Sequence, residues 1–248
     1  MMISTIMVCR NAASTIAGSV ESFLAQDHAE KELVVVDGAS SDGTLDVLAK
    51  YSDPSIKVES GQDGGIYNAM NKGLERFQGA GFGFLNADDR YTGASVLSEI
   101  ARALKTAEIV TGNLNFVSRH GARPVRVWPS ETYYAGAFRR GWSPPHPTTY
   151  ARRSVYERVG PFEPSFRIAG DYDWLLRALE IEGASHGTID ATLVDMALGG
   201  VSTASWRTPF QNAAEKLRSR RMRLGAPMVD VALFRGIFQK VAQMRPRQ

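Results

Sequence analysis

Residues 33–44 read LVVVDGASSDGT, and the opening of this stretch decides the fold class. The run Leu33–Val36 is apolar and mostly β-branched, which is typical of a strand buried on both faces of a parallel sheet. Asp37 ends the run. The SDG triplet at 41–43 then predicts a turn that caps a helix continuing to Tyr51.

The same alternation of strand and helix continues on both sides of this stretch. Ile3–Cys9 predicts a short buried strand, and the amphipathic segment after Ser14 predicts a helix. Further along, Lys57–Ser60 and Phe82–Leu85 predict two more strands, with a helix over Tyr67–Phe77 between them. The sequence therefore predicts an α/β fold, an open and mostly parallel sheet flanked by helices.

Charged side chains follow these strands at the point where each strand ends. Arg10, Asp37, Asp63 and Asp88 all lie near the carboxyl end of a predicted strand. In open α/β sheets, ligands bind beyond the carboxyl ends of the strands. We therefore expect these four residues to form one binding site.

The fourth strand ends in a group of acidic and amide side chains, in the sequence FLNADDRY at 84–91. Asn86, Asp88 and Asp89 offer the hard oxygen ligands that Mg²⁺ and Mn²⁺ prefer, and these ions often take only one or two of their ligands from protein. The alternative is a turn in which Asp88-Asp89 caps the next helix. Local sequence does not separate the two interpretations.

The segment DGGIYNAMNKG at 63–73 also has the composition of a ligand-binding loop. Its glycines permit close backbone approach, and Lys72 is suited to a phosphate. The chain has neither GxGxxG after its first strand nor GxxxxGK[ST]. This counts against a dinucleotide site and against the phosphate loop of an ATPase.

Four motifs in the same order carry a family resemblance: VVVDGASSDGT, QDGGIYNAMNKG, FLNADD and HPTTYARRSVYERVGPFEPSFRIAGDYDWLLR. Over about residues 1–205 the chain resembles the family 2 glycosyltransferases, in particular the bacterial cell-surface polysaccharide branch. The resemblance implies a GT-A fold over residues 1–206, with a nucleotide-binding half at 1–90 and an acceptor half at 91–206. It also implies transfer, with inversion, of a sugar from a nucleotide-diphospho-sugar to a glycan or lipid-linked acceptor.

The resemblance also implies roles for particular residues. Asp37 contacts the base or ribose of the nucleotide, and Asp88 binds a divalent metal, Mn²⁺ or Mg²⁺, with its share relative to Asp89 left open. Asn86 stands where the family commonly has the first acid of its metal motif. Asp171 matches the catalytic base, preceded by Gly170 where the family usually has a second acid. We expect nucleotide-sugar contacts from Arg10, Asp37, Asp63, Lys72, Asn86 and Asp88.

His146 lies in a proline-rich loop, between Pro145 and Pro147. A stiff backbone there holds the imidazole in one place. The side chain either contacts the acceptor or the pyrophosphate, or packs within the loop. We predict an acceptor-binding role.

The charge of the chain is unevenly distributed. Residues 207–248 carry ten Arg or Lys against two acids, whereas the first 206 residues carry 19 basic and 24 acidic side chains. This extension predicts two helices, Gln211–Leu224 and Val229–Met244, and is suited to an anionic membrane surface, to a homodimer contact or to packing on the body. The single cysteine, Cys9, and the short apolar runs predict a cytoplasmic protein, with the inner face of the membrane as a possible location.

Three rival functions fit parts of the sequence. A nucleic-acid-binding protein would use the basic extension, but the acidic body opposes this and we expect no nucleic-acid partner. A nucleotidyltransferase would also need a metal and carboxylates, and would release pyrophosphate. A catalytically silent binder of nucleotide sugars would explain Asn86 and Gly170.

Overall fold

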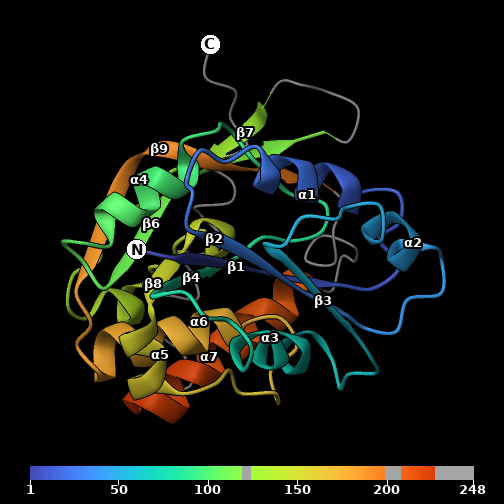
Figure 1. Ribbon diagram of the computed structural model, residues 1–248. Helices are drawn as coiled ribbons and strands as arrows, with labels where there is room; N and C mark the ends of the chain where they lie inside the picture. Colours follow the sequence, from blue (N-terminus) through green and yellow to red (C-terminus); the bar gives the residue numbers. More distant parts are fainter. Residues whose placement is uncertain (119–123, 199–207, 227–248) are drawn as a thin grey trace.

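Four parallel strands build one half of the sheet, in the order β3-β2-β1-β4. The computed structural model describes residues 1–118, 124–198 and 208–226. The four strands are β1 (Ile3–Cys9), β2 (Lys31–Asp37), β3 (Ile56–Ser60) and β4 (Gly81–Phe84), all close to their predicted positions. The parallel half of the predicted fold is therefore confirmed (Figure 1).

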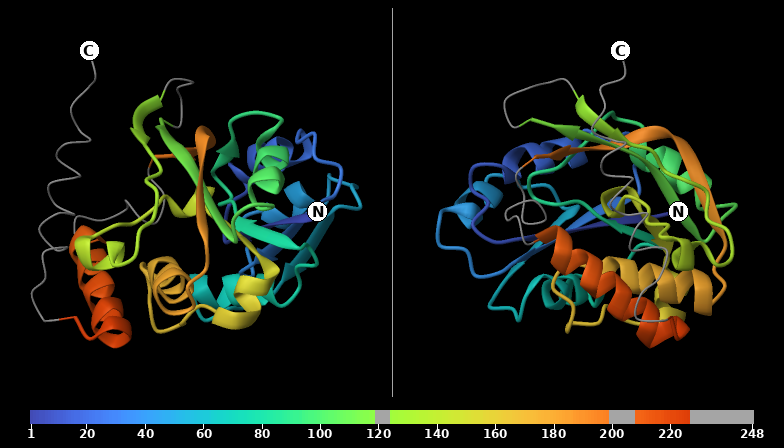
Figure 2. Two further views of the ribbon diagram at one scale, coloured as in Figure 1. Left: turned by 90° about the vertical axis from the view of Figure 1, so that its left-hand side faces the viewer. Right: turned by 180° about the vertical axis from the view of Figure 1, so that it is seen from behind.

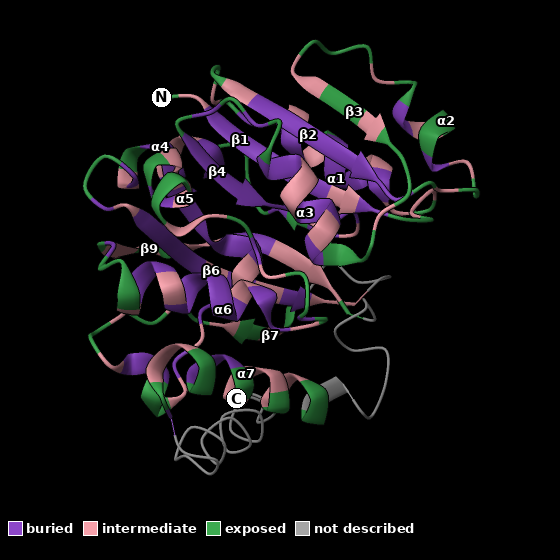
Figure 3. Cartoon of the chain, turned by 90° about the horizontal axis from the view of Figure 1, so that it is seen from below, coloured by how far each residue is buried: buried purple, intermediate pink, exposed green. Residues whose placement is uncertain are grey.

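The run at 33–36 is apolar because both faces of β2 are covered. Leu33 and Val35 belong to one hydrophobic core, and Val34 belongs to the core on the opposite face. The first core is covered by α1 (Ile16–Leu24), α2 (Thr44–Leu48) and α4 (Val96–Ala103); the second by α3 (Ile66–Leu74), α5 (Arg153–Val159) and α6 (Gly170–Leu176). The buried strands between these two helix layers are purple in Figure 3.

The other half of the sheet is mixed, so the sheet as a whole has as many antiparallel as parallel pairings. A short antiparallel strand, β8 (Tyr150–Arg152), lies between β4 and the long strand β6 (Ile109–Val117). The remaining strands are β9 (His186–Ala197), parallel to β6; β5 (Arg90–Tyr91), antiparallel to β9; and β7 (Pro124–Trp128), antiparallel to β6. Among the described residues there are also three short helical turns: η1 (Ala137–Arg140), η2 (His146–Thr148) and η3 (Arg177–Ile181).

A long helix, α7 (Thr208–Leu224), lies outside α6 (Figure 2). It matches the predicted helix at 211–224 apart from its earlier start. It ends where Gly225 adopts a φ of 63°, a left-handed conformation that favours glycine. The second predicted helix, Val229–Met244, lies outside the described residues. In the described part of the chain, no helix is long and apolar enough to cross a bilayer.

Candidate active site

Asp37 lies at the carboxyl edge of the parallel strands, where β2 pairs with Cys9 of β1 and Ser60 of β3. Its buried carboxylate accepts hydrogen bonds from the Ser60 hydroxyl at 2.6 Å and the Ser40 amide at 3.0 Å, and from the Ser40 hydroxyl. Burial raises the pKa of Asp37, but the hydrogen bonds from Ser40 and Ser60 outweigh it, so this pKa lies below its ordinary value. Asp37 is therefore a fixed negative charge at the strand edge.

Gly38 brings two further predicted residues to the same edge. A Cβ atom at position 38 would lie 2.7 Å from Oδ2 of Asp63 and 3.5 Å from Cβ of Arg10. Asp63 also accepts a hydrogen bond of 2.9 Å from the Gly65 amide, and Lys72 donates one of 2.6 Å to the carbonyl beside Asp63, that of Gln62. The structure thus brings Arg10, Asp63 and Lys72 together around the end of β2.

The acidic turn after β4 has one buried and one half-buried carboxylate. Asp89 is 1% exposed and accepts hydrogen bonds from the Asn86 side chain at 2.7 Å and the Ala197 amide at 3.1 Å. Burial, and then the charge of Asp88, raise the pKa of Asp89 to about 7. Asn86 is thus used locally, as the hydrogen-bond donor that holds Asp89.

The same turn is chemically suited to a divalent cation. The two neighbouring carboxylates disfavour each other's charge, and a cation beside them would relieve this repulsion. Among the residues that the structure describes, no three His, Cys, Asp or Glu side chains gather into a metal site. Mg²⁺ and Mn²⁺ often take only one or two ligands from protein and the others from water and substrate phosphates, and Asp88 would be such a ligand at this turn.

Asp171 lies in the first turn of α6 and faces residues from two other segments. The Tyr67 hydroxyl of α3 lies 3.3 Å from its Oδ1, and Nδ1 of His146 lies 4.0 Å from its Oδ2. Its side chain is 27% exposed, so one side of the carboxylate remains open to solvent. Asp171 is therefore accessible to a substrate on one side, while Tyr67 and His146 lie beside its carboxylate on the other.

His146 lies beneath Asp171 and packs against the last residue of β4. Its ring centroid is 5.5 Å from that of Phe84, and both side chains line a cavity of about 20 Å³ with Asp171 and Trp174. Burial lowers the pKa of His146, although the Asp171 carboxylate opposes this shift. The cavity is too small for a sugar. It nevertheless establishes that Asp171 lies close to the end of β4, the strand that leads to Asp88.

Tyr67 lies in the candidate site, although the sequence motifs did not single it out. A Cβ atom at Gly170 would lie 2.7 Å from the Tyr67 ring, so a larger side chain does not fit there. The ring occupies the place beside Asp171, and its hydroxyl also donates a hydrogen bond of 2.7 Å to the carbonyl of Ile168. At Gly170, where a second acid was expected from the family resemblance, the space beside Asp171 is thus filled by the Tyr67 ring of α3.

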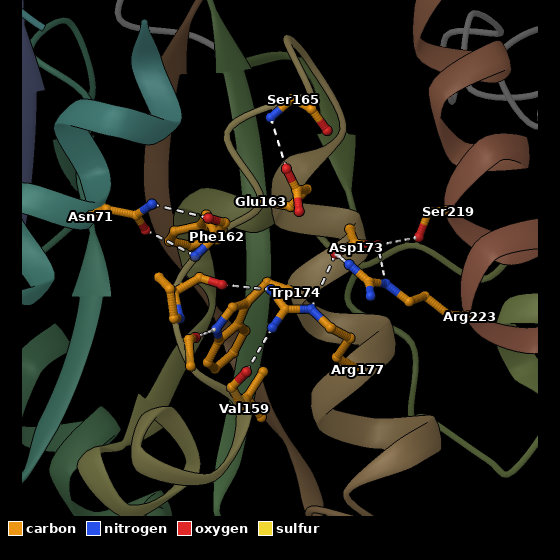
Figure 4. A network of polar contacts seen from close by, with 12 residues as sticks. Asn71, Val159, Phe162, Glu163, Ser165, Asp173, Trp174, Arg177, Ser219 and Arg223 are labelled. Carbon is orange, nitrogen blue, oxygen red and sulfur yellow. Dashed lines mark hydrogen bonds and ion pairs between the residues drawn. The ribbon is translucent and has the colours of Figure 1, made fainter. Parts of the chain in front are cut away.

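The next acid of the motif, Asp173, belongs to the interior. It is fully buried and accepts hydrogen bonds from Arg177 at 3.1 Å, from Ser219 at 2.8 Å and from Arg223 at 3.1 Å. Figure 4 shows these contacts between α6 and α7. Asp173 therefore joins the two helices, while Asp171 faces the site.

Comparison with known proteins identifies the family. The family model described as Glycosyl transferase family 2 matches residues 4–167, well over half of the chain. The chain belongs to glycosyl transferase family 2. The match includes the strand edge with Asp37 and Asp88, and ends before Asp171.

Two curated relatives illustrate the sequence likeness. A PGL/p-HBAD biosynthesis glycosyltransferase of Mycobacterium tuberculosis is 28% identical over 182 residues, which cover 71% of this chain and 69% of the relative. The succinoglycan biosynthesis protein ExoO of Rhizobium meliloti is 25% identical, and the match covers 89% of this chain and 73% of ExoO.

Solved structures share the fold. TarS of S. aureus in complex with UDP-GlcNAc has a TM-score of 0.72 at 20% identity, covering 94% of this chain and 69% of that one. The mannosyltransferase PcManGT of Pyrobaculum calidifontis, in complex with GDP-Man and Mn²⁺, has a TM-score of 0.68 at 18% identity, covering 98% and 69%. At these identities the likeness concerns the fold alone, which is the GT-A fold.

Proposed function

We propose that this chain is an inverting glycosyltransferase that moves a sugar from a nucleotide-diphospho-sugar to an acceptor hydroxyl, with Asp171 as general base. One observation carries the proposal: the partly exposed carboxylate of Asp171 lies beside the end of β4, the strand that leads to Asp88. An inverting transfer needs these two sites close together but separate. The leaving diphosphate and the proton of the attacking hydroxyl lie on opposite faces of the sugar.

In this mechanism the acceptor oxygen attacks the anomeric carbon while the bond from that carbon to the diphosphate oxygen breaks. The electron pair leaves with the diphosphate, and the hydroxyl proton passes to Asp171. Since the Tyr67 hydroxyl lies at Oδ1 of Asp171, Oδ2 is the oxygen better placed to take the proton. General-base help of this kind typically contributes about 10²–10⁴-fold to the rate.

We assign the donor nucleotide to residues 1–90 and the acceptor to residues 91–206, with His146 on the acceptor side. Arg10, Asp37, Asp63, Lys72 and Asn86 would bind the nucleotide sugar. Asp88, assisted by Asp89, would hold Mn²⁺ or Mg²⁺. When bound, such a cation supplies positive charge to the leaving diphosphate.

Two relatives support a polysaccharide or glycolipid product. Their names place them in succinoglycan and in PGL/p-HBAD biosynthesis. We therefore propose a glycan or lipid-linked acceptor and a role in polysaccharide biosynthesis, in the cytoplasm. Since UDP-GlcNAc and GDP-Man accompany the similar folds, UDP and GDP sugars are the first donors to test.

We further propose that the basic extension, residues 207–248, binds an anionic membrane surface. On α7, Phe210 and Met222 are 73% and 51% exposed, and Arg218 and Arg221 are exposed as well. Apolar side chains with flanking cations favour the interface of an anionic bilayer. Sedimentation with phosphatidylglycerol vesicles, but not with phosphatidylcholine vesicles, is expected at low salt. A homodimer in light scattering without vesicle binding would contradict the membrane assignment.

A thermal-shift screen of nucleoside diphosphates, with and without Mn²⁺, tests the donor site. We expect one nucleotide to raise the melting temperature, with part of the rise dependent on metal. Asp88→Ala is expected to abolish the metal-dependent part, while Asp46→Ala, an exposed acid on α2, should not. If no nucleotide stabilises the protein, the proposed function is wrong.

The same screen separates binding from chemistry. Asp171→Asn should bind the nucleotide as the wild type does, but release of nucleoside diphosphate from the bound donor should fall by about 10²-fold or more. Unchanged turnover in this variant would exclude Asp171 as the base. Release of pyrophosphate from a nucleoside triphosphate would indicate a nucleotidyltransferase instead.

A further inference from the structure

Glu215, in the middle of α7, binds the backbone just ahead of Asp171. Its Oε2 accepts hydrogen bonds from the amides of Ile168 and Ala169, both at 2.9 Å. The amide of Arg167 lies 3.2 Å from each carboxylate oxygen. One side chain thus binds three successive amides of a segment that lies 46 to 48 residues earlier in the chain.

Within the described residues, the acceptor of all three amides is Glu215, and none of them pairs with a group closer in sequence. Ala169 is the N-cap of α6 and carries no side chain able to accept a hydrogen bond from the helix start. Backbone amides that are shielded from water need an acceptor, and a carboxylate makes shorter and stronger bonds than a neutral group. Glu215 supplies this acceptor from outside the segment and fixes the direction from which the chain enters α6.

Glu215 is positioned by further contacts between α7 and α6. One turn along α7, Ser219 binds Asp173, and Arg223 binds the same carboxylate. Arg220 donates a hydrogen bond of 3.0 Å to the Tyr172 hydroxyl. Contacts to α7 therefore lie on both sides of Asp171, before it through Glu215 and after it through Asp173.

The carbonyl of Ile168, in the same segment, is bound by a residue of a different helix, α3. Tyr67 donates to the Ile168 carbonyl at 2.7 Å, while Glu215 accepts from the Ile168 amide. The peptide groups ahead of Asp171 are thus tied to α3 through one atom and to α7 through another. Asp171 is left with little freedom except rotation of its own side chain.

We propose that Glu215 is a positioning residue for sugar transfer: it binds the backbone of residues 167–169 so that the Asp171 carboxylate faces the acceptor hydroxyl. The inference rests on the proposed function, because it takes Asp171 as the base. A displacement of about 1 Å at a reacting group can cost roughly 10²-fold in rate. Since Glu215 does not belong to the strand edge that would bind the nucleotide, its loss is expected to affect turnover and not donor binding.

The test compares Glu215→Ala and Glu215→Gln with the wild type in the chain of residues 1–248. The probe is the nucleotide sugar found to bind in the thermal-shift screen, and the readout is its hydrolysis to nucleoside diphosphate, with water as the acceptor. We expect kcat to fall about tenfold or more in Glu215→Ala and less in Glu215→Gln, which retains one acceptor oxygen, with the KM for the donor unchanged in both. Gln211→Ala, at an exposed position one turn earlier on α7, is the matched control and should behave as the wild type.

The outcomes distinguish the two proposals. If Asp171→Asn loses turnover but Glu215→Ala retains the wild-type kcat, the positioning role is wrong and the proposed function stands. A rise in the donor KM with kcat unchanged overturns the positioning role as well. If Asp171→Asn turns over normally, or the wild type hydrolyses no donor that it binds, the proposed function fails first. Where Glu215→Ala does not fold, Glu215→Gln decides the matter by the same comparison of kcat with KM.

Discussion

Gly38 shows how a single residue type can shape the donor site. Its backbone φ is not in the left-handed region, so the reason for glycine here is space: a Cβ atom would lie only 2.7 Å from Oδ2 of Asp63. Gly38→Ala should therefore move Asp63 without straining the backbone. Loss of one charged hydrogen bond to the nucleotide costs about 1.5–3 kcal/mol, so affinity for the nucleoside diphosphate should fall roughly 10- to 100-fold.

Gly61→Ala is the matched control for this prediction. A Cβ atom at position 61 meets no other atom within 4 Å, so this variant should bind the nucleotide as the wild type does. Isothermal titration of both variants measures the difference. Equal affinity for Gly38→Ala and Gly61→Ala would argue against a nucleotide contact by Asp63.

At this scale the sequence indicates some residues of the candidate site and not others. Arg10, Asp37 and Asp63 are predictable because they follow parallel strands, whose carboxyl ends share one edge. Tyr67 and Glu215 are not, since their partners are backbone atoms 101 and 46 to 48 residues away. Basic side chains also dominate residues 207–248, and no sequence pattern there marks Glu215, the single acid of α7.

At the scale of elements, the join between α6 and α7 depends on one buried carboxylate. Asp173 is fully buried and is shared by Arg177, Ser219 and Arg223. Asp173→Ala should lower the free energy of unfolding by about 3 kcal/mol, because it leaves two guanidinium groups without their partner. Urea unfolding measures this loss, and Arg221→Ala, exposed on α7, should change stability little. A midpoint unchanged in Asp173→Ala would mean that α7 contributes little to stability.

The elements differ in how well the sequence predicts them. The parallel strands are predictable because Leu33–Val36 is apolar on both faces, and the end of α7 because Gly225 and Pro227 stop a helix. The antiparallel strand β8 has three residues and β5 has two, too few for any periodic pattern. Their pairing is determined by long-range contacts, which is why the second half of the sheet is mixed.

At the scale of the whole molecule, His186 makes folding sensitive to acid. Its Nδ1 accepts a hydrogen bond of 3.2 Å from the Tyr133 amide, and its Nε2 lies 2.9 Å from the Thr111 hydroxyl, so the folded chain holds the neutral ring. Burial lowers the pKa of His186 to about 4. Between pH 6.5 and pH 4 the unfolded chain binds a proton at this histidine that the folded chain does not. The free energy of unfolding therefore falls as the pH falls, by up to about 3 kcal/mol from this group. Above pH 6.5 the histidine is neutral in both states and makes no pH-dependent contribution.

The variant His186→Gln isolates that contribution. Its free energy of unfolding at pH 7 should be lower than that of the wild type, because glutamine cannot reproduce both hydrogen bonds. The difference between the two free energies should narrow as the pH falls to 5, because only the wild type loses the contribution of His186. Urea unfolding at pH 7, 6 and 5 gives the comparison, and parallel curves for His186→Gln and the wild type would contradict the assignment.

The contact between Glu215 and residues 167–169 also orders events during synthesis. Ribosomes add about 5–20 residues per second, so Glu215 is made roughly 2–9 s after Asp171. By the time Asp171 emerges, the nascent chain already contains every strand of the donor edge, β1 to β4. A newly made chain therefore contains the four parallel strands before the backbone ahead of Asp171 has its partner on α7.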